Sequence, residues 1–216
     1  MSDNPSGTVP NAIPVRLATH ADVDAVVATV NAAFATDPAW SFIVGPDNHA
    51  AREAFARSLL IPRMREGTAW ITDDCTAVAM WDRRSIEEAV DEEHKVIWAT
   101  FRADVGEEVW SRLSAYDTAV HGGSPPCPYW YLGVLATHPA HQGRGLASAV
   151  LRPALSAADD EGWDCWLETS TPANKEFYAG RGFTESIAFD IPGGPPTWWL
   201  RRPAPIHLSR SSAGIR

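Results

Sequence analysis

Tyr129-Trp-Tyr-Leu-Gly-Val-Leu-Ala-Thr137 is a continuous apolar run, and His138-Pro-Ala-His-Gln-Gly-Arg-Gly-Leu-Ala-Ser148 follows it directly. The first stretch is apolar at odd and even positions alike, as in a strand covered on both faces. In the second, two glycines precede apolar residues that recur at helical spacing, and Pro153 inside the run should kink the helix or shift its hydrogen bonding. Together they predict a buried strand, a glycine turn and a helix that starts near Gly143.

The predicted turn has the chemistry of an anion site. The N-terminus of a helix presents unpaired N–H groups and the positive end of its dipole. Gly143, Gly145 and Ala147 have little or no side chain, so a pyrophosphate group could approach the backbone closely. Arg144 adds a positive charge, and Gln142 is placed to form a hydrogen bond across the turn.

Three interpretations compete for this turn. A dinucleotide fingerprint begins with Gly143 and Gly145, and Glu168 lies at a suitable spacing for a ribose contact, but Ser148 stands at the third glycine position. A Walker-type phosphate loop requires a following Lys-Ser/Thr pair, which is absent. A ligand-free glycine turn is the third interpretation. The Gln-x-x-Gly-x-Ala pattern after a proline and a buried strand favours a bound ligand.

Hydrophobic periodicity predicts the remaining elements. A capping box formed by Thr19 and Asp22 starts the first helix, and Pro38 opens an aromatic turn with Trp40 and Phe42. The expected strands are 13–18, 68–72, 76–81, 129–137, 163–169, 183–190 and 197–201, and the expected helices are 19–34, 50–65, one after Gly143, and 172–178, with 86–120 mostly helical and 121–128 a loop. This order predicts a single domain of the α/β or α+β class.

Length and charge narrow the functional class. A chain of 216 residues that is 45% hydrophobic can bury one core. We expect a flexible N-terminus at 1–12, the domain at 13–203 and a tail at 204–216. The net charge of −9 makes a nucleic-acid partner unfavourable. No apolar run has membrane-spanning length and the N-terminus lacks a signal sequence, so we expect no membrane association.

Cysteine and histidine usage bears on metals and compartment. Cys75, Cys127 and Cys165 are odd in number and have no C-x-x-C spacing, which predicts reduced thiols in a cytoplasmic protein. His138 and His141 lie three residues apart without a third ligand in their segment. We therefore expect no metal.

Two motifs carry a family resemblance. Gln142, Gly145 and Ala147 match the acetyl-CoA signature Arg/Gln-x-x-Gly-x-Gly/Ala of the GCN5-related N-acetyltransferase (GNAT) superfamily, and the stretch 167–183 ends in its Tyr-x-x-x-Gly-Phe. The resemblance implies a mixed, mostly antiparallel sheet with splayed central strands flanked by helices. Within the superfamily the chain resembles the puromycin N-acetyltransferases most closely, through stretches at 15–19, 33–35, 78–81, 142–146, 167–170 and 196–198, and the resemblance fades at 86–128.

The resemblance also implies a set of site residues. The main chain of Leu135, Ala136 and Thr137 would hold the pantetheine arm, in the manner of an added strand. The pyrophosphate would lie on the turn formed by Gln142, Gly143, Arg144, Gly145, Leu146, Ala147 and Ser148. Asn174 is a candidate contact to pantetheine, and Tyr178 is the candidate acid for the departing thiolate, unless it is only a core aromatic.

Acetyl transfer to an amine also requires a base. Glu168 ends a central strand and is our candidate, although it could instead cap the following helix or pair with Arg181. Five tryptophans lie in or beside the segments expected to face the acceptor, which suggests an aromatic pocket: Trp40, Trp81, Trp98, Trp110 and Trp130.

The sequence therefore predicts transfer of acetyl from acetyl-CoA to an amine of a small molecule, an antibiotic or a metabolite, with a puromycin-like acceptor among the candidates. The resemblance also allows a homodimer. Three alternatives stay open: a protein N-acetyltransferase, a non-catalytic acyl-CoA sensor, and a dinucleotide-binding domain. Retention of both Glu168 and Tyr178 argues against the sensor.

Overall fold

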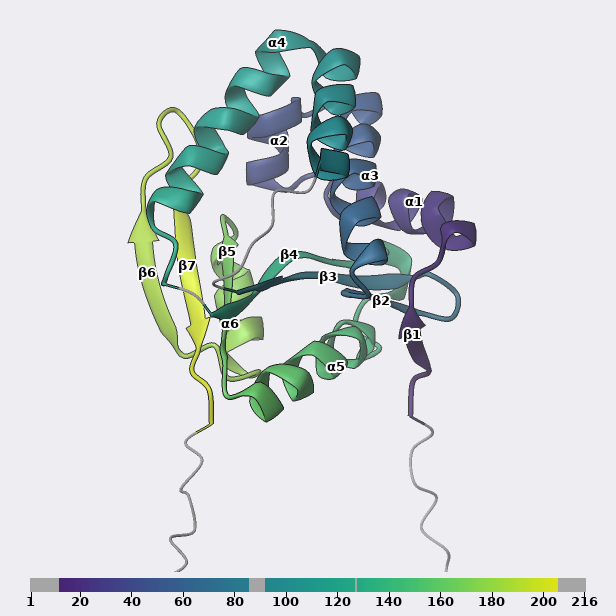
Figure 1. The fold of residues 1–216 in the computed structure, drawn as a ribbon, viewed down its shortest axis with the longest axis vertical. Coiled ribbons are helices and arrows are strands. Elements are labelled where there is room, and N and C mark those ends of the chain that lie inside the picture. The colour runs from purple at the N-terminus through teal and green to yellow at the C-terminus, as the bar shows by residue number, and fades with distance from the viewer. Residues whose placement is uncertain (1–11, 86–91, 127, 206–216) are drawn as a thin grey trace, which may run out of the picture.

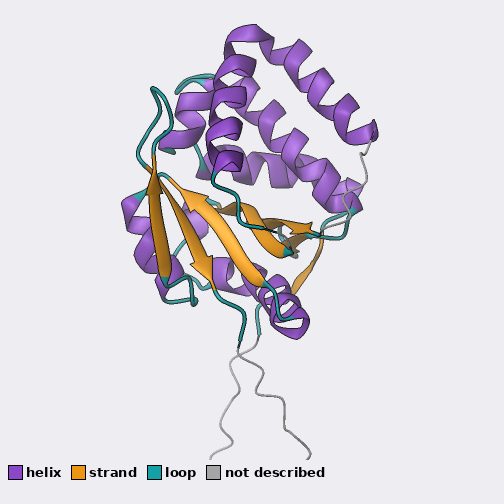
Figure 2. Cartoon of the chain, turned by 60° about the vertical axis from the view of Figure 1, so that its left-hand side comes forward, coloured by secondary structure: helices purple, strands orange, loops and turns teal. Residues whose placement is uncertain are grey.

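The computed structural model describes residues 12–85, 92–126 and 128–205, and they form one sheet with helices on both faces (Figures 1 and 2). The strands are β1 (Val15–Leu17), β2 (Ala69–Thr72), β3 (Ala77–Arg84), β4 (Tyr129–Thr137), β5 (Asp164–Thr169), β6 (Glu185–Phe189) and β7 (Thr197–Arg202). The helices are α1 (Val23–Ala33), α2 (Pro38–Val44), α3 (His49–Arg65), α4 (Glu92–Gly122), α5 (Leu146–Glu161) and α6 (Pro172–Ala179). The predicted fold class is confirmed.

The sheet is mixed, and its centre is open. Its order is β1-β2-β3-β4-β5-β7-β6, and only β4 and β5 run parallel. These two strands pair from Tyr129 and Asp164 as far as Tyr131 and Trp166, and then separate. The remainder of β4 pairs with β3 alone, which leaves its main-chain groups on the β5 side without a strand partner. The splay of the two central strands is thus confirmed.

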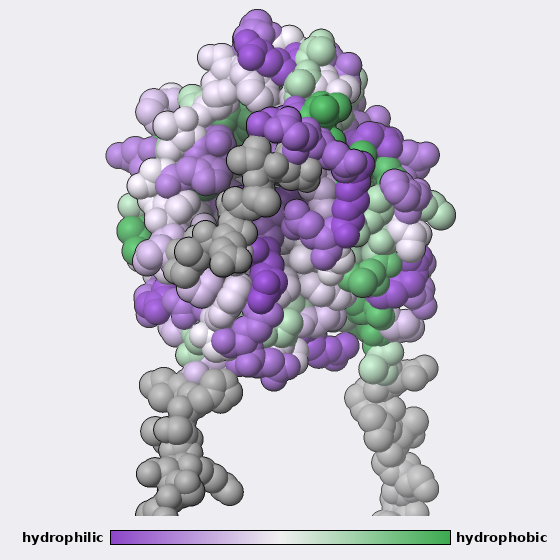
Figure 3. Space-filling view, viewed as in Figure 1, coloured by the Kyte–Doolittle hydropathy of each residue, from purple (hydrophilic) through white to green (hydrophobic). Residues whose placement is uncertain are grey.

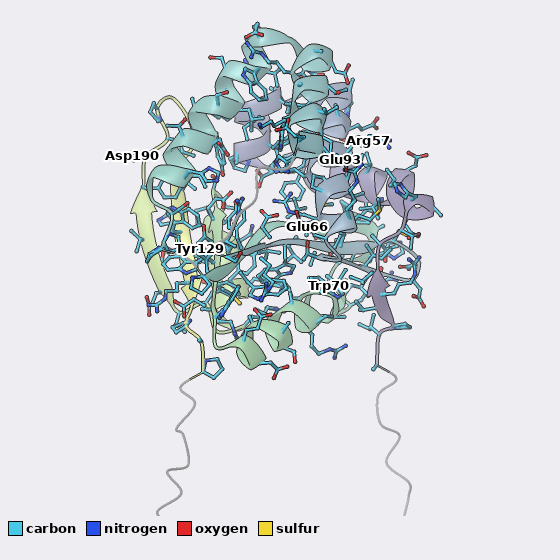
Figure 4. All side chains as sticks on the ribbon, viewed as in Figure 1. Arg57, Glu66, Trp70, Glu93, Tyr129 and Asp190 are labelled. Carbon is cyan, nitrogen blue, oxygen red and sulfur yellow. The ribbon has the colours of Figure 1, made fainter. Side chains whose placement is uncertain are left out.

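The two faces of the sheet have separate cores. Helices α1 to α4 cover one face, with residues such as Val26, Phe55 and Phe101 buried beneath them. Helices α5 and α6 cover the other face, where Val150, Leu151 and Leu167 are buried. In Figure 4, Trp70 lies on the α5 side of the sheet, whereas Glu66, at the end of α3, lies toward the helical layer opposite.

Helix α4 is two helical arms joined at Gly106. This glycine has φ 79° and ψ 172°, outside the helical region and in a part of conformational space that favours glycine. The chain folds back there, at the top of Figure 1, so both arms lie over the same face of the sheet. The expected helical character of 86–120 is confirmed for the described part, while residues 86–91 lie outside the described residues.

Local sequence signals account for most elements, and one prediction was wrong. The capping box forms, since the Thr19 N–H donates to Asp22 Oδ2 at 2.8 Å. The segment after Pro38, however, is a seven-residue helix and not a turn. Asp37 caps it by accepting from the Trp40 N–H at 3.0 Å, and Pro38 occupies its first turn. A helix of seven residues is too short to show a clear hydrophobic periodicity. The capping residue Asp37 was therefore the only feature of the sequence that indicated it.

The boundaries of two further segments differ from expectation. Helix α5 begins at Leu146, three residues after the predicted start, because Gly143 and Gly145 both adopt positive φ values. Helix α4 continues to Gly122, into the segment predicted as a loop.

Hydrophilic side chains cover most of the face of the molecule that Figure 3 shows, and apolar side chains form smaller groups there. Among the described helices, none is both long and apolar enough to cross a membrane.

Candidate active site

The glycine turn has the geometry of an open anion site. Gly143 and Gly145 have φ values of 75° and 79°, and Gly145 caps α5. The first backbone bond of the helix runs from the Ala149 N–H to the Gly145 carbonyl at 3.1 Å, so the preceding amides of α5 have no partner within the helix. A Cβ built on Gly143 would meet no atom within 4 Å. The turn therefore presents amides and free space, as a pyrophosphate requires.

Side chains around the turn support it from both sides. Gln142 Nε2 lies 3.4 Å from the Thr137 carbonyl, across the turn as expected, and Arg144 extends over the surface toward the Ala140 carbonyl. Arg181, which follows α6, donates to Ser148 Oγ from Nε at 3.2 Å. Burial lowers the pKa of Arg181, and its guanidinium stacks on the Phe177 ring. The tertiary structure thus places a second arginine beside the turn.

Strand β4 leads from this turn to the centre of the molecule. Leu135, Ala136 and Thr137 pair with β3 and have no partner strand on the side of β5. Gly133 stands at a β-bulge opposite Met80 and Trp81, and a Cβ there would lie 2.6 Å from Arg63 Nη2. Arg63 is buried and pairs with Asp82 at 2.7 Å. Any larger residue at position 133 would require the Arg63 guanidinium to shift from its place beside Asp82.

A cavity of about 850 Å³ opens where β4 and β5 separate. Its floor is formed by β4 and β5, and its walls by α2, α3, both arms of α4 and α6. Trp40, Trp98 and Trp110 line it, as expected of an aromatic pocket. Trp81 and Trp130 do not, because their side chains point to the opposite face and pack against the α5 core. The prediction was wrong for these two residues. Side chains alternate between the two faces of a strand, and the sequence did not show which of them would face the cavity.

Glu168 lies in this cavity, held by two phenols. Tyr131 on β4 donates to its Oε2 at 2.6 Å, and Tyr116 on α4 lies 3.4 Å from its Oε1. Burial raises the pKa of Glu168 to about 6, while the hydrogen bond from Tyr131 and, to a lesser extent, that from Tyr116 and the charge of His121 act against the rise. Among the described residues, Glu168 neither caps the following helix nor pairs with Arg181. A carboxylate that titrates near neutrality suits a general base.

Tyr178 and Asn174 line the same cavity from α6. The Tyr178 ring packs against Phe177 and Phe183, so it is also a core aromatic. Burial, and then the charges of Glu168 and Asp37, raise the pKa of its hydroxyl well above the usual value, which keeps it protonated. Among the described residues the hydroxyl has no hydrogen-bond partner. Asn174, one turn earlier, donates to Thr169 Oγ1 at 3.3 Å.

Three residues of the site were not predicted from the sequence. Tyr116 and Tyr131 lie 52 and 37 residues before Glu168, and nothing in the local pattern connects them with it. Asp37 lines the cavity at the start of α2, and burial raises its pKa. Arg181, expected as an alternative partner of Glu168, lies instead beside the glycine turn. For Asp37, the Asp-Pro pair typical of a helix start was a signal in the sequence. For the two tyrosines, only the tertiary structure shows that they lie close to Glu168.

Part of the chain matches a known family model, and its fold is similar to known structures. Residues 90–185 match the family model of the acetyltransferase (GNAT) domain. A Corynebacterium glutamicum structure named histone acetyltransferase HPA2 and related acetyltransferase is similar with a TM-score of 0.62 at 23% identity, covering 89% of this chain and 96% of that one. Arylalkylamine N-acetyltransferase 2 from Aedes aegypti has a TM-score of 0.59 at 14% identity, covering 90% and 100%.

A third similar structure is the polyamine N-acetyltransferase of Drosophila melanogaster, with a TM-score of 0.54 at 13% identity and coverage of 87% and 98%. At these identities the likeness establishes the fold. Among the described residues, no group of three or more His, Cys, Asp and Glu side chains is arranged to hold a metal ion.

Proposed function

We propose that this chain is an acetyl-CoA dependent acyltransferase of the GNAT superfamily, and that it transfers acetyl to the amine of a small molecule by direct attack. One observation carries the proposal. Glu168, Tyr178 and Asn174 line a single cavity at the point where β4 loses its partner strand. A base, an acid and an open main-chain edge thus meet at one place.

The cofactor runs along the open edge of β4. The amides before Ala149 and the two arginines near the turn, Arg144 and Arg181, bind the pyrophosphate. The main chain of Leu135, Ala136 and Thr137 binds the pantetheine amides as an added strand would, and Asn174 contacts the same arm. Acetyl-CoA bound in this way would present its thioester to the cavity that Glu168 and Tyr178 line.

The reaction balances with these groups. At neutral pH an alkylamine is protonated, with a pKa near that of lysine, so Glu168 first removes one proton from the ammonium. The neutral amine attacks the thioester carbonyl and forms the C–N bond. The adduct nitrogen loses its second proton to solvent, the C–S bond breaks as the carbonyl re-forms, and Tyr178 donates its proton to the departing thiolate. Tyr178 then regains a proton from solvent, and Glu168 releases the one that it took. The products are the amide and free coenzyme A thiol.

A small acceptor fits the cavity better than a polypeptide does. Its volume of about 850 Å³ is that of a pocket for a drug-sized ligand, and helices α2, α3 and α4 enclose it. Two of the similar structures are named for the acetylation of arylalkylamines and polyamines. An antibiotic amine of the puromycin type and an amine metabolite are both acceptors of this size.

The direct test is a screen. Purified protein is incubated with acetyl-CoA and a panel of primary amines, and release of thiol is followed together with the mass of the acetylated product. We expect turnover with at least one amine and no acetylation of a histone-tail peptide. Binding of coenzyme A without turnover on any amine would favour the sensor, and preferential peptide acetylation would favour the protein N-acetyltransferase.

Assembly and compartment complete the proposal. We expect a cytoplasmic protein that can form a homodimer; Cys75 and Cys165 are free thiols, in keeping with a reducing compartment. Light scattering at several concentrations measures the oligomeric state, and a fluorescent fusion locates the protein in cells.

A further inference from the structure

We infer that Asp37 binds the positive charge of the acceptor, and that the acceptor is an organic ammonium with an aromatic body. This inference rests on the proposed function and names the substrate class of the same site. Three observations support it: the position of Asp37 in the cavity, the lack of a cation beside its carboxylate among the described residues, and the aromatic rings on the same wall.

Asp37 lies on the cavity wall, near the catalytic pair. It precedes Pro38 at the start of α2 and accepts from the Trp40 N–H at 3.0 Å. Its negative charge raises the pKa of Tyr178 on α6 and of Tyr116 on α4, in both cases together with the charge of Glu168. Two carboxylates from different elements, Asp37 and Glu168, therefore act on the same two phenols.

Among the described residues, two other carboxylates of the cavity pair with cations, whereas Asp37 does not. Asp82 pairs with Arg63 at 2.7 Å and with Arg84 at 3.4 Å, and Asp117 pairs with His121 at 3.0 Å. Asp37 instead is held by backbone N–H groups, those of Trp40 and Ala39. Within the described part of the chain no cation lies within ion-pair distance of it. A partly buried carboxylate without a cation is costly, and a bound ammonium would remove that cost.

Aromatic rings continue from Asp37 along the same wall. The Trp40 ring lies 4.4 Å from that of Phe34 and 4.7 Å from that of Phe55, between ring centroids. Phe55 in turn lies 6.2 Å from Trp98. A ligand with its ammonium at Asp37 and Glu168 would place its body against these rings. An aromatic body stacks well on such a surface, and the ammonium itself gains from the ring faces.

The substitution that tests this is Asp37→Asn. Asparagine is about as good a helix N-cap as aspartate, so α2 keeps its cap while the charge is lost. The matched control is Asp117→Asn, which removes a carboxylate from the same cavity that His121 already neutralises. Both variants are first compared with the wild type by thermal unfolding.

Binding is measured by calorimetry with two unreactive probes of similar shape, trimethyl(2-phenylethyl)ammonium and 2-phenylethanol. We expect the wild type and Asp117→Asn to bind the cation more tightly than the alcohol. In Asp37→Asn the affinity for the cation should fall roughly 10- to 100-fold, as on loss of one partner of a buried charge pair, while the affinity for the alcohol stays within about twofold. Equal affinity of the wild type for both probes, or a preference that survives in Asp37→Asn, would overturn the inference.

The aromatic body is tested with trimethyl(butyl)ammonium, an aliphatic cation without a ring. The wild type should bind it at least roughly tenfold more weakly than the phenylethyl probe, the difference that an aromatic contact provides. Equal binding would contradict an aromatic acceptor. None of the probes is acetylated, so these binding measurements do not depend on turnover. The amine screen alone tests the proposed function.

Discussion

The Tyr131 hydroxyl donates a 2.6 Å hydrogen bond to Glu168 Oε2 across the point where β4 and β5 separate. Tyr131 is the last residue of β4 that pairs with β5, and Glu168 lies two residues beyond its partner Trp166. The bond therefore spans the opening of the sheet and fixes the carboxylate at the mouth of the splay. It also stabilises the charged form of Glu168 against the effect of burial.

Removing this bond should move the acid limb of the activity profile. In Tyr131→Phe the pKa of Glu168 rises, so the fall of kcat/KM with decreasing pH should begin about one unit higher than in the wild type. Tyr116→Phe, which loses a 3.4 Å contact, should shift the limb less. Profiles of kcat/KM from pH 5 to 9 measure both shifts. A limb that does not move in Tyr131→Phe would mean that another group titrates.

Replacing Glu168 by glutamine should remove the base and stabilise the protein. We expect kcat to fall by about 10²–10⁴ at pH 7, the usual contribution of general base catalysis. The pKa of Glu168 is raised from 4.5 to about 6 on folding, so folding favours its neutral form, and ionisation lowers stability as the pH rises through this window. Glu168→Gln should therefore be more stable than the wild type by up to about 2 kcal/mol above pH 6 and equally stable below pH 4.5.

Thermal unfolding at several pH values measures this difference. Glu176→Gln, a change at an exposed glutamate on α6, is the control and should leave both stability and rate unchanged. If Glu168→Gln showed the same stability difference at every pH, Glu168 would not be the group that titrates near 6.

Tyr178→Phe should lower kcat without unfolding the protein. Phenylalanine keeps the ring between Phe177 and Phe183 and removes only a hydroxyl without a described partner. A thiolate with a pKa of about 8.5 leaves even without an acid, so the loss should lie near the lower end of general acid catalysis, about 10²-fold, with KM for acetyl-CoA nearly unchanged. Steady-state kinetics and melting temperatures measure both effects. Wild-type turnover, with chemistry shown to be the slow step, would leave Tyr178 a core residue.

The glycine turn is tested at Gly145. Its φ of 79° is unfavourable for any β-branched residue, and Gly145 stands at the N-terminus of α5, where we propose that the pyrophosphate binds. Gly145→Val should abolish acetyl-CoA binding in calorimetry. Gly162, which ends the same helix with φ 69°, provides the matched control: Gly162→Val strains the backbone equally, by about 1–2 kcal/mol, but should bind normally. Equal loss of binding in both variants would show that strain, not the site, is responsible.

The sequence determined the elements that local chemistry encodes. The apolar run at β4 predicted its strand from Tyr129 to Thr137 because both faces are covered, and the glycine spacing predicted the turn before α5. Pro172 and the spacing of Asn174, Tyr178 and Gly182 predicted α6. Two linked motifs carried the resemblance to the GNAT superfamily.

Only the tertiary structure decided which side chains meet. The phenols of Tyr116 and Tyr131 reach Glu168 from a helix and a neighbouring strand, and Asp37 approaches from a third element. Trp81 and Trp130 turned away from the cavity because a strand sends alternate side chains to opposite faces, and the sequence does not say which face lies over the acceptor. Contacts between residues distant along the chain depend on how the helices pack on the sheet, and the local hydrophobic periodicity does not predict that packing.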